Sequence, residues 1–225
     1  MNNKIAKPLG QAAGARKAQR DATRARILAA ALKVFAEKGF DGAGTREIAE
    51  RADVRQGLIG HYFESKEALW KEAVTTLFRD LTARMAAIPL GERDFEGSFR
   101  EGIRIYVRFC AERPEHARIM QHAGTRKGPL LSWLVETHVR GAYDSLQRVL
   151  ARAKREGLAP PVRGPLLHYI LNGAAQSVYA LEPEARLLIG EAVTSPKWVE
   201  EHADALADLL LGRRVNAKGK QRQRA

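Results

Sequence analysis

The chain has 225 residues, of which 45% are hydrophobic, so it is long and apolar enough to form one or two globular domains. Its single cysteine, Cys110, excludes an intrachain disulfide and fits a reducing cytoplasm. The N-terminus, MNNKIAKPLG, lacks an apolar run of signal-peptide length, so a cytoplasmic protein is expected.

The net charge of +12 is concentrated at the two ends of the chain. Residues 1–20 carry five cations and residues 213–225 carry six, with no acid in either segment. The body between them is therefore nearly neutral. We predict two disordered basic arms, which could bind phosphate backbones or merely keep the chain soluble.

The body is predicted to be all-α. Residues 21–38 place apolar side chains on one stripe, and Gly39 is expected to end this helix. We find no alternating pattern typical of strands. Pro and Gly separate the other periodic segments, which predict helices over residues 46–52, 55–62, 66–86, 94–111, 114–122, 129–156, 163–181 and 196–211.

Residues 45–66 are typical of two short helices joined by a tight turn. Thr45 is expected to N-cap the first helix, and Asp53 to form the turn, because Asp tolerates a left-handed backbone. In the second helix, Ile59 and Phe63 would pack inward. The side chains left outward are those of Arg55, Gln56, Leu58, His61 and Tyr62. This pattern predicts a helix-turn-helix, whose second helix enters the major groove of DNA.

Residues 164–181 contain no charged side chain. Their length approaches that of a membrane span, but His168, Asn172 and Gln176 make the segment too polar for one. A helix that is apolar on most sides is otherwise buried. We therefore favour a helix packed between the domain core and a second subunit over one buried wholly within its own domain.

Residues 23–70 resemble the DNA-binding domain of the TetR family of bacterial transcriptional regulators. The resemblance lies in TRARILAAALKVFAEKGF, GTREIAERADV and LIGHYFESKEALW, in this order. It implies an N-terminal three-helix DNA-binding domain over residues 21–66 and a larger helical effector-binding and dimerisation domain over residues 67–212. The basic segments 1–20 and 213–225 flank these domains.

The resemblance also implies a role for individual residues. Thr45 and Arg46 would contact DNA phosphates, and Tyr62 and Lys66 would clamp the backbone. The residues that would face the base edges are Arg55, Gln56, Gly57 and Leu58. The chemistry is consistent, because Gln can pair with adenine and Arg with guanine through two hydrogen bonds.

Two positions depart from the family pattern. The family usually has Ser or Thr, as N-cap of the recognition helix, where this chain has Arg55, and a missing cap costs about 1 kcal/mol. It commonly has Tyr where this chain has Gly60, and Gly inside a helix costs about 1 kcal/mol relative to Ala. We therefore expect Arg55 to serve DNA binding, and the recognition helix to be ordered in part by DNA.

The family resemblance implies a homodimeric repressor that binds a palindromic double-stranded DNA operator and is released by a small molecule. The last two long helices would form the dimer interface, through Leu167, Ile170, Leu171, Ala174, Val178, Trp198, His202 and Leu209. A hydrophobic or aromatic effector is expected. The candidate pocket residues are Phe99, Ile103, Tyr106, Phe109, Cys110, Met120, Trp133, His138 and Tyr169.

Other classes of function have less support. The sequence has no nucleotide-binding loop, no G-x-S-x-G and no H-E-x-x-H, so an enzyme is disfavoured and no catalytic residue, metal or cofactor is expected. His116 and His122 carry metal-ligating side chains, but they are six residues apart and do not share a helical face, so a metal site there is disfavoured. A sequence-independent architectural DNA-binding protein remains the main alternative, although the nearly neutral body argues against it.

Overall fold

The computed structural model describes residues 9–88, 95–155, 157 and 160–211. These residues form helices and no strand, as predicted. The chain divides into two compact units, the first ending at Thr76 and the second beginning at Leu77. We expected a boundary after residue 66, but the division falls inside α4 (Lys66–Ala86). The first turns of α4 belong to the N-terminal unit, where the ring of Trp70 lies 6.2 Å from that of Phe40.

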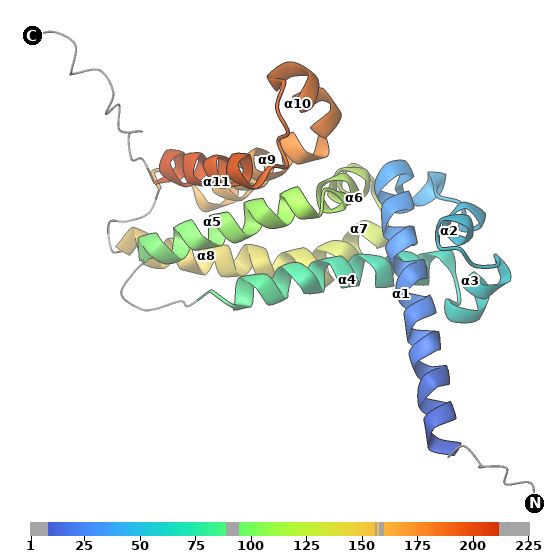
Figure 1. Ribbon diagram of the computed structural model, residues 1–225. Coiled ribbons are helices and arrows are strands. Elements are labelled where there is room, and N and C mark those ends of the chain that lie inside the picture. The colour runs from blue at the N-terminus through green and yellow to red at the C-terminus, as the bar shows by residue number, and fades with distance from the viewer. Residues whose placement is uncertain (1–8, 89–94, 156, 158–159, 212–225) are drawn as a thin grey trace, which may run out of the picture. The chain divides into compact units, whose positions relative to one another are not determined.

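The N-terminal unit packs α1 (Leu9–Gly42), α2 (Thr45–Arg51) and α3 (Gly57–Tyr62) with the start of α4 (Figure 1). Apolar residues at helical spacing give α1 one buried stripe. The core contains Ile27, Val34, Phe35, Ile48, Ile59, Phe63, Leu69 and Trp70. Gly39 interrupts α1 with φ 69° and ψ 178°, as the sequence predicted, because Gly adopts this backbone without steric cost.

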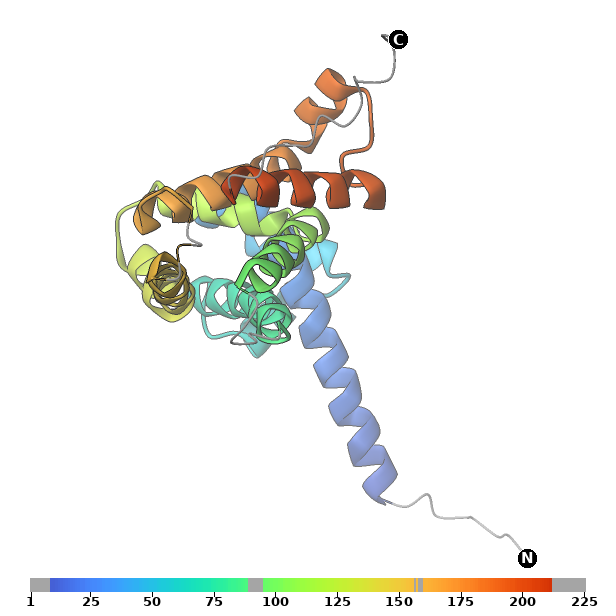
Figure 2. The same ribbon diagram turned by 90° about the vertical axis from the view of Figure 1, so that its left-hand side faces the viewer.

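The N-terminal arm differs from the prediction of disorder. The first helix begins at Leu9, so residues 9–20 of the predicted arm are helical (Figures 1 and 2). This segment is rich in Ala, Gln, Arg and Lys, which are strong helix formers, and extending an existing helix needs no new nucleus. Residues 1–8 of the arm, and the whole predicted C-terminal arm, lie outside the described residues.

The C-terminal unit contains the rest of α4 and the helices that follow it. They are α5 (Phe95–Glu112), α6 (Glu115–Gly124), α7 (Pro129–Leu134), the π-helical segment η1 (Val135–Val139), α8 (Arg140–Arg155), α9 (Gly164–Ala180), α10 (Glu182–Ile189) and α11 (Pro196–Leu210). The observed bounds lie within two residues of the predicted ones for α5, α6, α9 and α11. Fully buried side chains of this unit include Phe109, Ile119, Leu134, Leu167 and Ala203.

Two features of this unit were not predicted. The helix expected over residues 129–156 contains a π-helical segment, which apolar periodicity does not reveal. No helix was predicted at the position of α10, because Pro183 was expected to mark a break between helices. Proline favours the first turn of a helix, and Pro183 lies in the first turn of α10, so it marks a helix start.

The uncharged helix α9 has one buried and one exposed side. Leu167, Ala175 and Tyr179 are buried, whereas Tyr169 and Ile170 are 75% and 45% exposed. This division agrees with a helix that has one side in its own core and the other side open. None of the described helices has the length and apolar character needed to span a bilayer.

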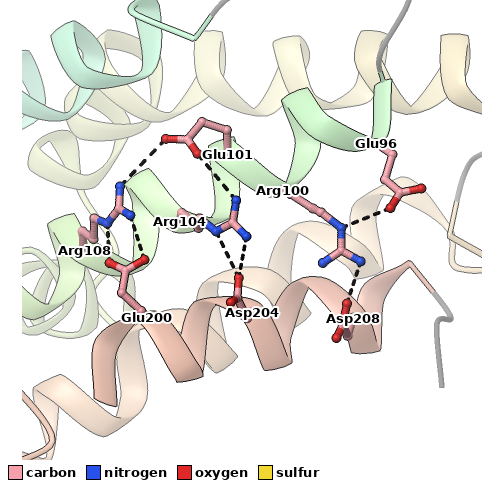
Figure 3. A network of polar contacts seen from close by, with 8 residues as sticks. All are labelled: Glu96, Arg100, Glu101, Arg104, Arg108, Glu200, Asp204 and Asp208. Atoms are coloured by element: carbon pink, nitrogen blue, oxygen red, sulfur yellow. Dashed lines mark hydrogen bonds and ion pairs between the residues drawn. The ribbon is translucent and has the colours of Figure 1, made fainter. Parts of the chain in front are cut away.

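A ladder of ion pairs joins α5 to α11 (Figure 3). Three arginines spaced four residues apart on α5 face three acids with the same spacing on α11. The nitrogen–oxygen distances are 2.6 Å for Arg100–Asp208, 2.7 Å for Arg104–Asp204 and 2.6 Å for Arg108–Glu200. The hydrogen bond from Arg108 lowers the pKa of the Glu200 carboxyl. The matched spacing holds α11 in one register along α5.

Candidate functional site

The turn between α2 and α3 brings the two helices into the helix-turn-helix arrangement. Asp53 has φ 51°, the left-handed conformation that the sequence predicted. The backbone amides of Asp53 and Val54 donate to the carbonyls of Glu50 and Ala49 at 3.2 and 3.0 Å. Backbone hydrogen bonds therefore close the turn.

The helix starts differ from the prediction. Thr45 is the first helical residue and not the N-cap of α2, because Gly44 takes the extended N-cap conformation and accepts the hydrogen bond of Ile48 at 3.1 Å. At α3 the N-cap position belongs to Gln56, with φ −53° and ψ −39°, and not to Arg55. Neither helix has a side-chain cap. The side chain of Gln56, a predicted reader of base edges, has no capping role.

One face of α3 is exposed. Ile59 and Phe63 are 5% and 4% exposed and anchor the helix in the core, as predicted. The predicted DNA-contacting residues on this helix are exposed at Arg55, Gln56, Gly57 and His61, and half-buried at Leu58 and Tyr62. The structure thus brings these residues together on the outer side of a short, anchored helix.

Two of the predicted phosphate contacts, Thr45 and Lys66, line a hollow of about 420 Å³. Its lining also includes Gln56, Gly57 and the acidic Glu64. Residues from the starts of α2, α3 and α4 meet there. Helix N-termini present backbone N–H groups and partial positive charge, which favour a phosphate.

Lys66 is the first residue of α4. Its Nζ is 3.2 Å from the carbonyl oxygen of Asp41 and 4.9 Å from the centre of the Phe40 ring. Ser65 caps α4 by accepting the Ala68 amide at 3.0 Å. These contacts position the Lys66 ammonium group at the edge of the hollow.

Ion pairs orient α2 on α1. Glu47 accepts from Lys38 at 2.6 Å and from Arg51 at 2.8 Å, and Arg51 also binds Glu37 at 2.6 Å. The hydrogen bond from Lys38 lowers the pKa of Glu47. The remaining predicted phosphate contact, Arg46, pairs with Glu50 at 3.0 Å on the surface, where its side chain is 82% exposed. This exposed pair is weak enough for a phosphate to replace Glu50.

Comparison with known proteins agrees with this geometry. Residues 27–73 match the family model of the bacterial regulatory proteins of the tetR family, and this range covers the helix-turn-helix. The N-terminal unit contains a DNA-binding domain of the tetR family. The resemblance drawn from the sequence, and the all-α fold that it implied, are therefore confirmed.

Individual relatives extend the match beyond the DNA-binding domain. The chain is 30% identical to the transcriptional repressor NicS of Pseudomonas putida over 51% of this chain and 54% of that protein. It is 25% identical to the transcriptional regulator RutR of Escherichia coli over 82% and 87%. A transcriptional regulator of Rhodococcus has a similar crystal structure, with a TM-score of 0.61 and 25% identity over 84% of this chain and 96% of that one. These TetR-family proteins are transcriptional regulators and not enzymes.

The C-terminal unit gathers most of the predicted pocket residues. Five of them are buried along α5, namely Phe99, Ile103, Tyr106, Phe109 and Cys110. Three others, Met120, Trp133 and His138, are half-buried on α6, α7 and η1. The prediction is wrong for Tyr169, which is 75% exposed on the outer side of α9. Without a three-dimensional fold, the sequence could not tell which side of this uncharged helix faces the core.

Sequence reasoning missed two members of this aromatic cluster. His116 is only 4% exposed, and its ring centre lies 5.1 Å from that of Phe78 and 5.4 Å from that of Phe109. Phe78 also stacks on His138 at 4.9 Å. The Nδ1 atom of His116 is buried without a hydrogen-bond partner among the described residues. Burial lowers the pKa of His116 to about 4, so the ring is uncharged at neutral pH.

A second buried polar group lies next to the aromatic cluster. The hydroxyl group of Tyr106 forms hydrogen bonds with the side chains of Asn172 and Gln176 on α9. Burial raises the pKa of Tyr106, and it raises that of the adjacent Cys110 to about 12. Cys110 is therefore a protonated thiol in the core, in line with the small hydrophobic residue expected from the sequence.

The predicted dimer contacts divide into two groups. Ile170 and Leu209 are 45% and 74% exposed. Leu171, Ala174, Val178, Trp198 and His202 are half-buried. The prediction is wrong for Leu167, which is fully buried in its own core and inaccessible to a second chain. The exposed leucines of α10, Leu187 and Leu188, were not predicted.

Proposed function

We propose that this protein is a homodimeric repressor of the TetR family that binds a palindromic operator through α3 and is released by a small molecule. The observation that carries the proposal is the exposed face of α3 on a helix-turn-helix that matches the family. Its relative NicS bears the name of a repressor. The dimer would place one α3 on each half-site, about one turn of DNA apart or a multiple of it.

Within each half-site the side chains would divide their roles. Gln56 and Arg55 are exposed ahead of the first turn of α3, where a recognition helix meets base edges. Lys66, beside the hollow, would bind a phosphate. Tyr62 and Thr45 would contact the same backbone.

A dimer is supported by an exposed apolar face of α9 and by one exposed leucine near the end of α11. Tyr169, Ile170 and Leu209 expose large apolar side chains on these two helices. Contiguous exposed apolar residues typically mark interaction sites. The ladder between α5 and α11 would hold this face in a fixed relation to the helix that carries most of the aromatic cluster.

The aromatic cluster around His116 is the proposed effector site. An uncharged, planar or otherwise hydrophobic molecule would fit the rings of Phe78, Phe109 and His138. A polar group on that molecule would satisfy the unpaired Nδ1 of His116. The π-helical segment that carries His138 is a further mark of function, since such segments are frequent at functional sites.

Selection of bound duplexes from a random pool tests the DNA-binding role. A palindrome is expected, and a pool without a shared motif would contradict the proposal. The variant Gln56→Ala should cost about 1–3 kcal/mol on the selected operator and relax the preference at one position per half-site. Lys66→Ala should weaken all duplexes alike. Lys197→Ala, which removes an exposed cation on α11, is the charge-matched control and should change neither.

A further inference from the structure

The N-terminal turns of α1 extend beyond the core that the rest of the helix helps to form. Burial along α1 begins at Thr23, and every residue from Gly14 to Ala22 is exposed. In two views the N-terminal turns of α1 stand clear of α2 and α3 (Figures 1 and 2). Residues 14–22, which we name the helical arm, therefore contribute little to the packing of the N-terminal unit.

The cations of the helical arm lack acidic partners. Arg16, Lys17 and Arg20 precede the first acid of the chain, Asp21, and none of the three forms an ion pair with another described residue. In the packed part of the same unit, five of the nine cations pair with acids, for example Arg24 with Glu72, Lys38 with Glu47 and Arg51 with Glu37. The three cations of the arm are all unpaired among the described residues and lie within five consecutive residues, so the arm carries a compact, unmatched positive charge.

We propose that the helical arm binds the phosphate backbone of duplex DNA beside the half-site that α3 reads. This inference rests on the proposed DNA-binding function. The arm's nine residues span about 14 Å at 1.5 Å per residue, close to the length of four base pairs. Arg16 and Arg20 are one helical turn apart and share a side of the helix, with Lys17 adjacent, so one strand of phosphates can meet all three.

The composition of the arm favours DNA over a membrane surface. A helix that lies on a bilayer needs an apolar face with large side chains. Residues 14–22, GARKAQRDA, offer only Gly and Ala beside the polar side chains. Such a helix has charge for phosphates and no apolar face for lipid.

The helical state gives the arm a property that a disordered arm lacks. In a continuous α1 the three cations keep a fixed direction relative to the helix-turn-helix, which the same helix supports through Ile27 and Phe35. A disordered arm would have to be ordered on binding, at a cost in conformational entropy. Breaking the helix without changing its charge should therefore weaken DNA binding.

The test compares charge removal with helix breaking in the full-length protein. The triple variant Arg16→Gln, Lys17→Gln, Arg20→Gln is titrated with a 30-base-pair duplex of random sequence and with the selected operator, between about 50 and 200 mM salt. Each phosphate that the variant no longer neutralises lowers the salt slope by about 0.9. If all three cations bind phosphates, raising the salt from about 50 to 200 mM should reduce the affinity of the wild type up to about 40-fold more than that of the variant. The selected motif should stay the same.

Two more variants separate the alternatives. Ala18→Pro keeps all charges but breaks the arm, and should lose part of the affinity for both duplexes. The single variant Arg16→Gln removes one cation from the arm. Lys33→Gln removes one exposed cation from the packed part of α1; it is the matched control and should not change the salt slope. Thermal unfolding followed by circular dichroism checks that all variants fold, as expected because the arm is exposed.

An unchanged salt slope in the triple variant would overturn the proposal. Wild-type affinity in Ala18→Pro would overturn the requirement for a helix. Failure of the proposed function is distinguishable, because it would leave the wild type without a selected motif. The measurement on the random duplex does not depend on finding one.

Discussion

Replacing His116 with leucine should make the stability of this protein less sensitive to acid. His116 is buried among Phe78, Tyr106 and Phe109, and its Nδ1 has no hydrogen-bond partner among the described residues. Burial disfavours the charged ring and lowers its pKa from 6.5 to about 4. In the unfolded chain the same ring is solvated and protonates near pH 6.5.

The sign and size of the effect follow from linkage. Between pH 6.5 and pH 4 the unfolded state binds the His116 proton and the folded state does not, so stability falls as the pH is lowered through this window. Above pH 6.5 this group leaves the stability unchanged. The difference of about 2.5 pKa units corresponds to about 3 kcal/mol between pH 7 and pH 4.

Urea unfolding at pH 7, 6, 5 and 4 would measure this effect. At pH 7 the leucine variant should be at least as stable as the wild type, because it removes a buried, unpaired polar atom. Its advantage should grow by about 3 kcal/mol by pH 4. His122→Leu, at an exposed position of the same helix, is the control and should show no such growth. An advantage for His116→Leu that stayed constant from pH 7 to pH 4 would refute the reasoning.

Three further predictions concern α3, the ladder and the dimer face. Gly60→Ala should stabilise the N-terminal unit by about 1 kcal/mol in urea unfolding, because a Cβ there meets no atom within 4 Å; a loss of stability would contradict this. A double-mutant cycle to alanine at Arg100 and Asp208 should give a coupling of about 1 kcal/mol that weakens at 1 M salt, and no coupling would mean that the pair does not hold α11 on α5. Ile170→Glu should shift a dimer to monomer in sedimentation experiments, whereas Leu187→Glu on α10 should not; equal effects would place the interface elsewhere.

The helix-turn-helix could be predicted from the sequence because its determinants are local. The left-handed Asp53, the break at Gly39 and the inward Ile59 and Phe63 all appear as expected. Backbone preference and helical spacing act over a few residues, so a short window of sequence carries them. The errors at Thr45 and the start of α3 are shifts of one or two residues at helix ends, where neighbouring residues can exchange the capping role.

The aromatic cluster and the proposed dimer face were predicted less well. The sequence placed Tyr169 in the pocket and Leu167 in the interface, but in the structure Tyr169 is exposed and Leu167 is buried in its own core. An uncharged helix gives no polar side to mark the solvent, so its orientation depends on the helices packed against it. His116 was weighed only as a metal ligand, because its aromatic neighbours come from distant parts of the chain.

The sequence by itself determined the helical fold, the position of the helix-turn-helix and the concentration of charge at the ends of the chain. These properties follow from composition, periodicity and turn chemistry, which are local. Only the tertiary structure decided that His116 Nδ1 is buried without a partner among the described residues and that α5 and α11 are joined in register by a ladder. These properties depend on contacts between residues far apart in the chain, and a linear pattern does not encode which distant side chains meet.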